Sequence, residues 1–386
     1  MRINHIHFYV EDAKQWRNWF IHHLGFEAVT FDYAIPLKES FHTCTEVVKS
    51  DSVCFLLSSP LLPTSPVAEY LRQHPPGVAD VAFDVEDVEE TLAQSQVYGV
   101  KVLQPIQQHQ QGEESVKWSQ IAAWGGLTHT LIETRKEEEL DNLSFPYSSN
   151  ITAIDHIVLN VPEGDLEQRK EEELDNLSFP YSSNITAIDH IVLNVPEGDL
   201  EHAVAWYKNI LDFQPQQMFK IKTNRSALHS QVMVSPQGNV QLPINEPATP
   251  NSQIQEFINV NRGAGIQHIA LRTPNIVEAI AKFRSSGLCF LRVPQSYYEI
   301  LAIRQGLPLS PTELQAIAQQ EILVDWQENT PEALLLQIFT QPIFGQPTFF
   351  FEFIERKNQA QGFGEGNFRA LFEAIESEQL KRGSLN

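Results

Sequence analysis

Residues 188–215 read IDHIVLNVPEGDLEHAVAWYKNILDFQP, and this stretch predicts one strand, one helix and the start of a second strand. An apolar run opens it, and the turn-forming residues VPEGD follow. Ala203, Trp206 and Ile210 then recur at helical spacing. The first predicted strand carries His190, so this unit contains both a folding signal and a residue able to do chemistry.

The same pattern occurs three more times in the chain. It is seen in INHIHFYVEDAKQWRNWFIHHLGFEAV at 3–29, VADVAFDVEDVEETLAQSQVYGVKVL at 78–103 and IQHIALRTPNIVEAIAKFRSSGLCFL at 266–291. Each copy is followed by further strand-like segments, such as LLLQIF and PTFFFEFIER after the last one. We therefore expect an α+β protein in which four βαβββ modules pair into two domains, followed by a C-terminal helix.

A second repeat is of a different kind. RKEEELDNLSFPYSSNITAIDHIVLNVPEGDLE occupies 135–167 and returns letter for letter at 169–201, an offset of 34 residues. Diverged structural repeats keep a pattern and not every letter. The identity therefore indicates a recent duplication of DNA or an assembly error in the recorded sequence, and one copy is surplus to the fold. The second copy runs directly into its helix, so we expect His190 and not His156 to be used.

Composition limits what the protein can be. The chain has 386 residues, enough for two domains, and we expect an N-terminal domain without metal at 1–134, a linker with the surplus segment at 135–183 and a metal-binding domain at 184–386. The formal net charge of −22 argues against a nucleic-acid partner. The chain has no run of about 18 apolar residues, which is the length that a membrane-spanning helix requires. With three scattered cysteines and no leader pattern, we expect a cytoplasmic protein, and we also expect a homo-oligomer.

Three residues of the second half occupy related places. His190 in IDH and His268 in IQH lie in first strands of their modules, and Glu352 lies in the closing strand FFFEFIER. A single such histidine is more often an ordinary core or surface residue. A carboxylate among phenylalanines is costly to bury without a metal or a partner. Two histidines and one carboxylate suit Fe(II) with open coordination positions, although Mn and Zn accept the same ligands.

The first half offers an internal comparison. Aligning its strands with those of the second half places His5, Asp80 and Thr130 at the three corresponding positions. Threonine cannot replace the anionic ligand. We therefore expect the N-terminal half to be a scaffold and the metal to belong to the C-terminal half.

Several segments of the second half together resemble the 4-hydroxyphenylpyruvate dioxygenases, a family with the vicinal oxygen chelate (glyoxalase-like) fold. They are GIQHIAL, PINEP, SQIQEF, LLLQIF, FFFEFIER and GFGEGNFRALFEAIE. The resemblance covers the whole chain apart from the extra 34 residues. It implies open-barrel domains, a C-terminal lid helix, and Fe(II) held by His190, His268 and Glu352. It also implies a dioxygenase that converts 4-hydroxyphenylpyruvate, a 2-oxo acid, and O2 to homogentisate and CO2, for tyrosine breakdown or for quinone and tocopherol synthesis.

The resemblance also implies a substrate pocket. Polar residues at matching positions are Ser230, Asn245, Gln253, Gln267 and Gln337, and the aromatic ones are Phe339 on the pocket strand and Phe350, Phe363 and Phe368 as a clamp on the substrate ring. Strand alternation points Gln267 away from the metal, where it would support a ligand. The plainer alternative is an ordinary half-buried polar residue for each glutamine and for Ser230, and core packing for the phenylalanines.

Two other functions are compatible with this pattern. A 4-hydroxymandelate synthase has the same fold and iron but hydroxylates the benzylic carbon, and its residues matching Asn245 and Phe368 tend to be aliphatic. The asparagine and phenylalanine found here favour attack on the ring. A non-catalytic binding protein of the same fold is the third possibility, and the intact ligand set argues against it.

Overall fold

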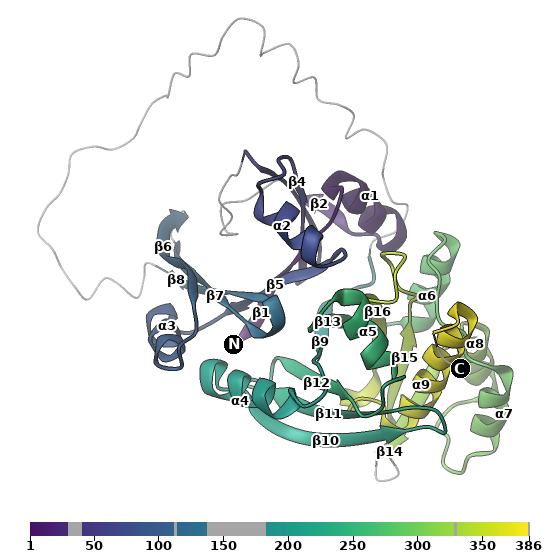
Figure 1. Ribbon diagram of the computed structural model, residues 1–386. Helices are drawn as coiled ribbons and strands as arrows, with labels where there is room; N and C mark the ends of the chain where they lie inside the picture. The colour runs from purple at the N-terminus through teal and green to yellow at the C-terminus, as the bar shows by residue number, and fades with distance from the viewer. Residues whose placement is uncertain (30–40, 112–113, 137–182, 328–329, 385–386) are drawn as a thin grey trace, which may run out of the picture.

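The structure is a computed structural model that describes residues 1–29, 41–111, 114–136, 183–327 and 330–384 (Figure 1). The first copy of the duplicated segment beyond Lys136, including His156, lies outside the described residues. Within the described ranges, no helix is long and apolar enough to cross a membrane.

The first sheet, as far as the structure describes it, has eight strands in the order β2-β3-β4-β1-β5-β8-β7-β6. They are β1 (Arg2–Tyr9), β2 (Glu27–Val29), β3 (Thr43–Ser50), β4 (Val53–Pro60), β5 (Gly77–Asp84), β6 (Val102–Gln111), β7 (Glu114–Ala122) and β8 (Thr128–Lys136). The helices of this half are α1 (Ala13–Leu24), α2 (Pro66–Gln73) and α3 (Val88–Val97), with a short 3-10 turn at Trp124–Gly126.

The second sheet repeats this arrangement, with the described strands in the order β10-β11-β12-β9-β13-β16-β15-β14. They are β9 (Ala187–Asn194), β10 (Gln214–Lys222), β11 (Ala227–Val234), β12 (Gln241–Pro247), β13 (Gly265–Arg272), β14 (Leu323–Gln327), β15 (Thr330–Phe339) and β16 (Phe350–Arg356). The helices are α4 (Leu200–Leu211), α5 (Gln253–Asn261), α6 (Ile276–Ser285), α7 (Gln295–Ile303), α8 (Pro311–Gln319) and α9 (Glu365–Arg382), with a 3-10 turn at Lys357–Gln359.

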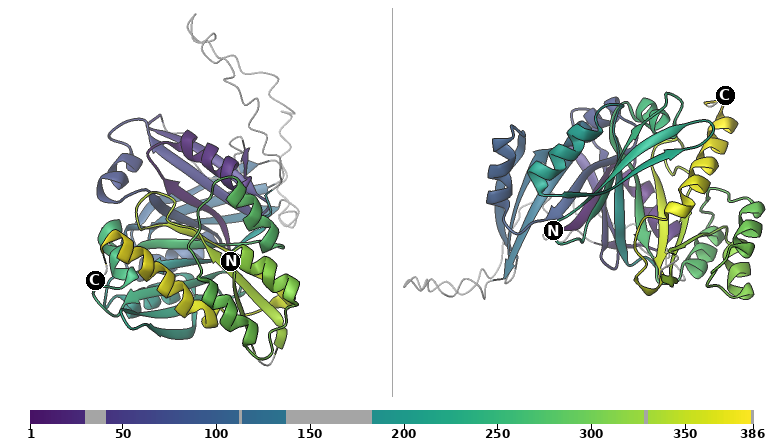
Figure 2. Two further views of the ribbon diagram at one scale, coloured as in Figure 1. Left: turned by 90° about the vertical axis from the view of Figure 1, so that its right-hand side faces the viewer. Right: turned by 90° about the horizontal axis from the view of Figure 1, so that it is seen from below.

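The prediction of four βαβββ modules in an α+β fold is confirmed. Two modules meet where β1 pairs with β5, and two meet where β9 pairs with β13, both antiparallel. The sequence pattern did not predict β14 or the helices α7 and α8, which lie between α6 and β15. A strand of five residues that follows inserted helices is too short for its alternating pattern to be recognised. Helix α9 (yellow) lies against β10, β14 and α5 (Figure 2).

One hydrophobic core is shared by the two halves. Phe351 of β16 is fully buried, and its ring lies 6.0 Å from that of Phe20 and 5.9 Å from that of Phe55, both in the first half. Phe8 of β1 contacts Phe349 edge-on, with 5.2 Å between the ring centroids. Buried aromatic pairs of this kind stabilise by more than their area alone. The first half therefore supports the strand that carries Glu352.

Polar contacts between the halves fix where the chain enters the second sheet. The hydroxyl of Ser50 donates to the carbonyl of Ile185 at 2.7 Å, and Ile185 itself is fully buried. In α4, the Tyr207 hydroxyl lies 3.1 Å from His129 Nε2 of β8. Both ends of the segment that contains β9 are thus held by the first half.

The shared core gives the first prediction. Replacing Phe351 with alanine should lower the free energy of unfolding by about 3–5 kcal/mol, because it leaves a cavity between the two halves. The matched control is Val97→Ala at the end of α3, which removes a side chain that is 79% exposed and should change stability by less than about 0.5 kcal/mol. Denaturant unfolding measures both. Equal effects of the two substitutions would contradict a shared core.

Candidate metal centre and its pocket

Three donor atoms from three strands converge inside the second sheet. His190 on β9, His268 on β13 and Glu352 on β16 are all buried, and their ligand atoms lie within 4.8 Å of one another. Strand pairing produces this, because Ala270 lies opposite His190 on one side and beside Glu352 on the other. Glu352 Oε2 is 3.1 Å from His190 Nε2 and 3.7 Å from His268 Nε2.

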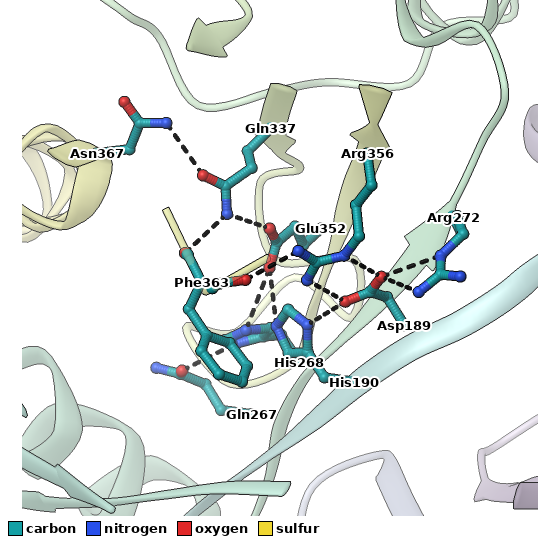
Figure 3. A network of polar contacts seen from close by, with 11 residues as sticks. Asp189, His190, Gln267, His268, Arg272, Gln337, Glu352, Arg356, Phe363 and Asn367 are labelled. Carbon is teal, nitrogen blue, oxygen red and sulfur yellow. Dashed lines mark hydrogen bonds and ion pairs between the residues drawn. The ribbon is translucent and has the colours of Figure 1, made fainter. Parts of the chain in front are cut away.

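The other polar atom of each ligand is already engaged (Figure 3). His190 Nδ1 lies 3.0 Å from Asp189 Oδ1, and His268 Nδ1 lies 3.1 Å from Gln267 Oε1. Glu352 Oε1 accepts a hydrogen bond of 2.8 Å from Gln337 Nε2. Such partners orient metal ligands and fix which imidazole nitrogen is free. Each residue therefore presents one free atom toward a common point, which is what a cation requires.

Electrostatics in the absence of a cation agree with this geometry. Burial lowers the pKa of His268 well below its usual value, and the neighbouring His190 lowers it further, so that its imidazole is neutral. Burial alone would lower the pKa of His190 too, but Glu352 and Asp189 outweigh it and raise the pKa to about 9. A proton on His190 thus balances the buried negative charge that a metal would otherwise neutralise.

Asp189 keeps its negative charge because of the groups that contact its carboxylate. Burial would raise the pKa of this carboxyl, but Arg356 and His190 hold it well below its usual value. Arg356 donates to both carboxylate oxygens at 2.7 Å, and Arg272 donates to Oδ2 at 2.7 and 3.1 Å. The Asp189 side chain is fully buried. Sequence analysis did not single out these residues, although the arginines stand at the ends of ligand-bearing strands.

All the residues expected in the pocket line a single cavity of about 90 Å³ with the three ligands. The polar ones come from different elements, namely Ser230 from β11, Asn245 from β12, Gln253 from the start of α5, Gln267 from β13 and Gln337 from β15. The aromatic ones are Phe339 on β15, Phe350 on β16, Phe363 just before α9 and Phe368 within α9.

Three of these side chains lie differently from what strand alternation or a ring clamp alone suggests. Gln267 lies beside His268 and lines the cavity, because the β9–β13 register shifts between Ile266 and His268. Phe350 stacks on the His268 ring at 4.8 Å between centroids. Phe363 meets the His190 ring edge-on at 5.3 Å. Both phenylalanines therefore pack against ligand imidazoles as well as facing the cavity.

The segment before α9 is attached to the ligand set through Gln337. Its Nε2 donates both to Glu352 and to the carbonyl of Phe363 at 3.0 Å, and its Oε1 accepts 3.0 Å from Asn367 Nδ2. Gly364 is required here for two reasons. Its φ of 75° is disfavoured for other residues, and an added Cβ would lie 1.9 Å from Gln337 Oε1.

Sequence analysis missed some pocket residues as well. Asn367 is buried between Gln337 and the Tyr297 hydroxyl, which donates to its Oδ1 at 2.9 Å, and Phe219 packs edge-on against Phe368 at 5.0 Å. Gln253 Oε1 is buried and, within the described residues, has no hydrogen-bond partner. A buried acceptor of this kind is unfavourable unless a ligand satisfies it.

The first half has a different set of residues at the same positions. His5 on β1 lies opposite Ala82, as His190 lies opposite Ala270, and Asp80 corresponds to His268. Thr128 donates to Asp80, and Gln120 donates to it at 3.2 Å. Burial raises the pKa of the Asp80 carboxyl to about 6, and burial lowers the pKa of His5 to about 3. Thr128 and Gln120, which donate to Asp80, are uncharged side chains of the first half.

Comparisons with known proteins agree with the fold. Residues 187–300 and residues 4–117 each match the Glyoxalase/Bleomycin resistance protein/Dioxygenase superfamily. The chain is 36% identical over 406 residues to a 4-hydroxyphenylpyruvate dioxygenase from Caenorhabditis briggsae, covering 99% of this chain and 93% of that protein. It is 35% identical over 415 residues to one from Coccidioides posadasii (strain C735), covering 99% and 94%. The solved structure of a 4-hydroxymandelate synthase mutant from Streptomyces coelicolor has the same fold, with a TM-score of 0.75, 23% identity and 98% of both chains covered.

The proton on His190 gives the second prediction. Because the folded-state pKa is about 9, raised from 6.5, this proton stabilises the metal-free fold below pH 6.5, and that contribution is lost as the pH rises toward 9. A cation must displace it, so the affinity for Co(II) should rise about tenfold per pH unit across this window. Titration calorimetry at several pH values measures this. An affinity that does not change with pH would mean that His190 is neutral before the metal binds.

Proposed function

This chain belongs to the 4-hydroxyphenylpyruvate dioxygenase family, and we propose that it carries out the family's reaction at the site formed by His190, His268 and Glu352. The enzyme converts 4-hydroxyphenylpyruvate and O2 to homogentisate and CO2. The observation that carries the assignment of the site is the convergence of three buried donor atoms whose remaining polar atoms are occupied.

We propose Fe(II) as the metal. Two imidazoles and one carboxylate form the ligand set of non-haem Fe(II) oxygenases, and they leave positions open for other ligands. Bound Fe(II) would supply electrons to O2 and would offer those open positions to the carboxylate and keto oxygens of the 2-oxo acid. The fit in charge is also good, because the site holds one buried carboxylate, Glu352, facing two histidines.

The side chains around the site have separate tasks in this proposal. Ser230 and Asn245, which are paired between β11 and β12, line the cavity together with Gln253, and the three polar side chains orient the substrate. The unpartnered Gln253 Oε1 is suited to accept a hydrogen bond from the phenol hydroxyl. The aromatic side chains Phe350 and Phe363 keep the space beside the ligands apolar.

We propose that α9 acts as a lid. Its residues Phe368, Leu371, Phe372 and Ile375 face the cavity, and it is attached through Gly364. A cover of apolar side chains keeps water from the reacting centre and so prevents side reactions of reactive intermediates that would use O2 without forming product. Asn245 and Phe368 both face the cavity, which supports attack on the ring and not on the benzylic carbon.

Further proposals concern the whole chain. We propose domains at 1–134 and 184–386, joined by a linker at 135–183. The cysteines Cys44, Cys54 and Cys289 are unpaired, which supports a reducing cytoplasm as the working location. On α7, Ile300 and Ile303 are 67% and 82% exposed one turn apart, and this apolar pair supports a homo-oligomer.

The third prediction tests the reaction and its ligand together. Purified protein supplied with Fe(II) and 4-hydroxyphenylpyruvate should consume O2 and form homogentisate. Glu352→Gln should keep the fold and lose most turnover, because it removes the anionic ligand at almost constant volume. An oxygen electrode and chromatography of the product measure the two quantities, and circular dichroism confirms the fold.

The possible outcomes distinguish the dioxygenase from the two alternative functions. Formation of 4-hydroxymandelate would identify a synthase, and tight binding of the substrate without O2 uptake would identify a binding protein. Turnover by Glu352→Gln close to that of the wild type would show that Glu352 is not a ligand.

The structure bears on which copy of the duplicated segment supplies the histidine. The second copy ends at Glu201, inside the first turn of α4, which begins at Leu200. The loop before it is held because the backbone N–H groups of Gly198 and Leu200 donate to Glu246 Oε2. Use of the first copy would interrupt α4 after its first residues. Additional length between the domains costs little loop entropy by comparison.

The fourth prediction is that His190→Ala loses bound iron and turnover, whereas His156→Ala keeps both. The two histidines have identical sequence neighbours from 21 residues before them to 11 after them, so His156→Ala is a matched control. Metal analysis and O2 consumption measure the result. Loss in His156→Ala with retention in His190→Ala would reverse the assignment.

Deleting residues 135–168 provides a complementary test. Because the repeat is exact, any deletion of 34 residues that starts between 135 and 168 gives the same polypeptide. That product keeps one intact copy, joined both to β8 and to α4. We expect turnover equal to or greater than that of the full chain. A loss of turnover in a folded protein would show that the surplus segment has a function.

A further inference from the structure

A buried ion pair connects one proposed metal ligand with the segment that precedes α9 (Figure 3). Asp189 Oδ1 accepts from Arg356 Nη2 at 2.7 Å and lies 3.0 Å from His190 Nδ1. Arg356 Nε donates to the other carboxylate oxygen, also at 2.7 Å. The pair is therefore bidentate, and one of its oxygens is shared with the imidazole.

The same guanidinium reaches the chain on the way to α9. Its third nitrogen, Nη1, donates to the carbonyl of Ala360 at 3.1 Å and to that of Gly362 at 2.9 Å. Gly362 has a φ of 86°, and the helix begins three residues later. The Arg356 side chain thus links Asp189 Oδ1, the oxygen that orients His190, to the turn that leads into α9.

We propose that Arg356 is a positioning residue that couples the seating of α9 to the orientation of His190. This inference rests on the proposed function of the site. When α9 is seated, the carbonyls of Ala360 and Gly362 hold the guanidinium in place, and the guanidinium holds Asp189 against the imidazole. When that turn moves away, Arg356 loses two acceptors, and Asp189 loses the partner that fixes its position.

The requirement for arginine follows from geometry and burial. A planar guanidinium can bind a carboxylate through two nitrogens and present a third to other acceptors, whereas a lysine ammonium is a single point. The Arg356 side chain is only 10% exposed and that of Asp189 is fully buried. Buried ion pairs stabilise little relative to apolar packing, so their value lies in fixing a geometry.

Arg272 provides a control within the same cluster. It pairs with the same carboxylate, but only through Oδ2, and its side chain is 45% exposed. No described contact links it to the segment 360–364. Arg356→Lys and Arg272→Lys both keep the positive charge, but only Arg356→Lys changes the link to the segment before α9.

The experiment uses the full chain in three measurements. Limited proteolysis of the metal-free protein reports whether the segment before α9 is protected, titration with Co(II) reports metal affinity, and the ratio of homogentisate formed to O2 consumed reports coupling. We expect Arg356→Lys to increase cleavage before α9, to weaken Co(II) binding about tenfold and to lower the ratio. Arg272→Lys should change each by about twofold or less, as expected of a partly exposed ion pair.

A second variant keeps the inference testable if Arg356→Lys fails to fold. Asp189→Asn retains an acceptor for His190 and has no direct contact with α9, yet it should also expose the segment to protease, because Arg356 loses its anion. Equal behaviour of the Arg356 and Arg272 variants, or unchanged protection in Asp189→Asn, would overturn the coupling. Failure of the wild type to form homogentisate would overturn the proposed function instead, and the proteolysis and Co(II) results would still decide the coupling.

Discussion

A buried carboxylate facing two imidazoles is the constraint on which the rest of the second half depends. Glu352 lies in a strand of phenylalanines, where an unpaired charge is costly. His190, His268 and Gln337 surround it, and each is itself held by a further polar partner. Burial and charge therefore prepare the site for a cation before one binds, at the cost of a proton held on His190.

The pairing of β9 with β13 is what brings this cluster together. The two strands are the first strands of their modules, and they run antiparallel, so each presents its histidine to the same interior. The first half has the same pairing between β1 and β5 but carries Asp80 and Thr130 at two of the corresponding places. The duplicated architecture thus provides two similar interiors. Among the described residues, only the second interior brings three possible metal ligands together at these positions. A carboxylate group of the first half, formed by Asp87, Glu89 and Glu133, is paired with Arg135 and Lys117 instead.

The first half still contributes to the site through packing. Phe20 and Phe55 contact Phe351, the neighbour of Glu352, and Ser50 holds the chain just before β9. Because neighbours along a strand point to opposite faces, an aromatic core on one face positions the carboxylate on the other. This explains how the first half can determine where Glu352 lies, although the three converging side chains all belong to the second half.

Local sequence patterns determined much of this protein. Periods of 2 and 3.6 gave the four modules, the types and places of His190, His268 and Glu352 indicated the ligand set, and the resemblance indicated the pocket residues. Only the tertiary structure decided which side chains support them. Asp189 and Arg356 are 167 residues apart, and they meet because β9, β13 and β16 are neighbours in one sheet. The shift that turns Gln267 toward His268 arises from the register between two strands. A periodic pattern records the face on which a residue lies, whereas these contacts depend on which distant strand is paired with it.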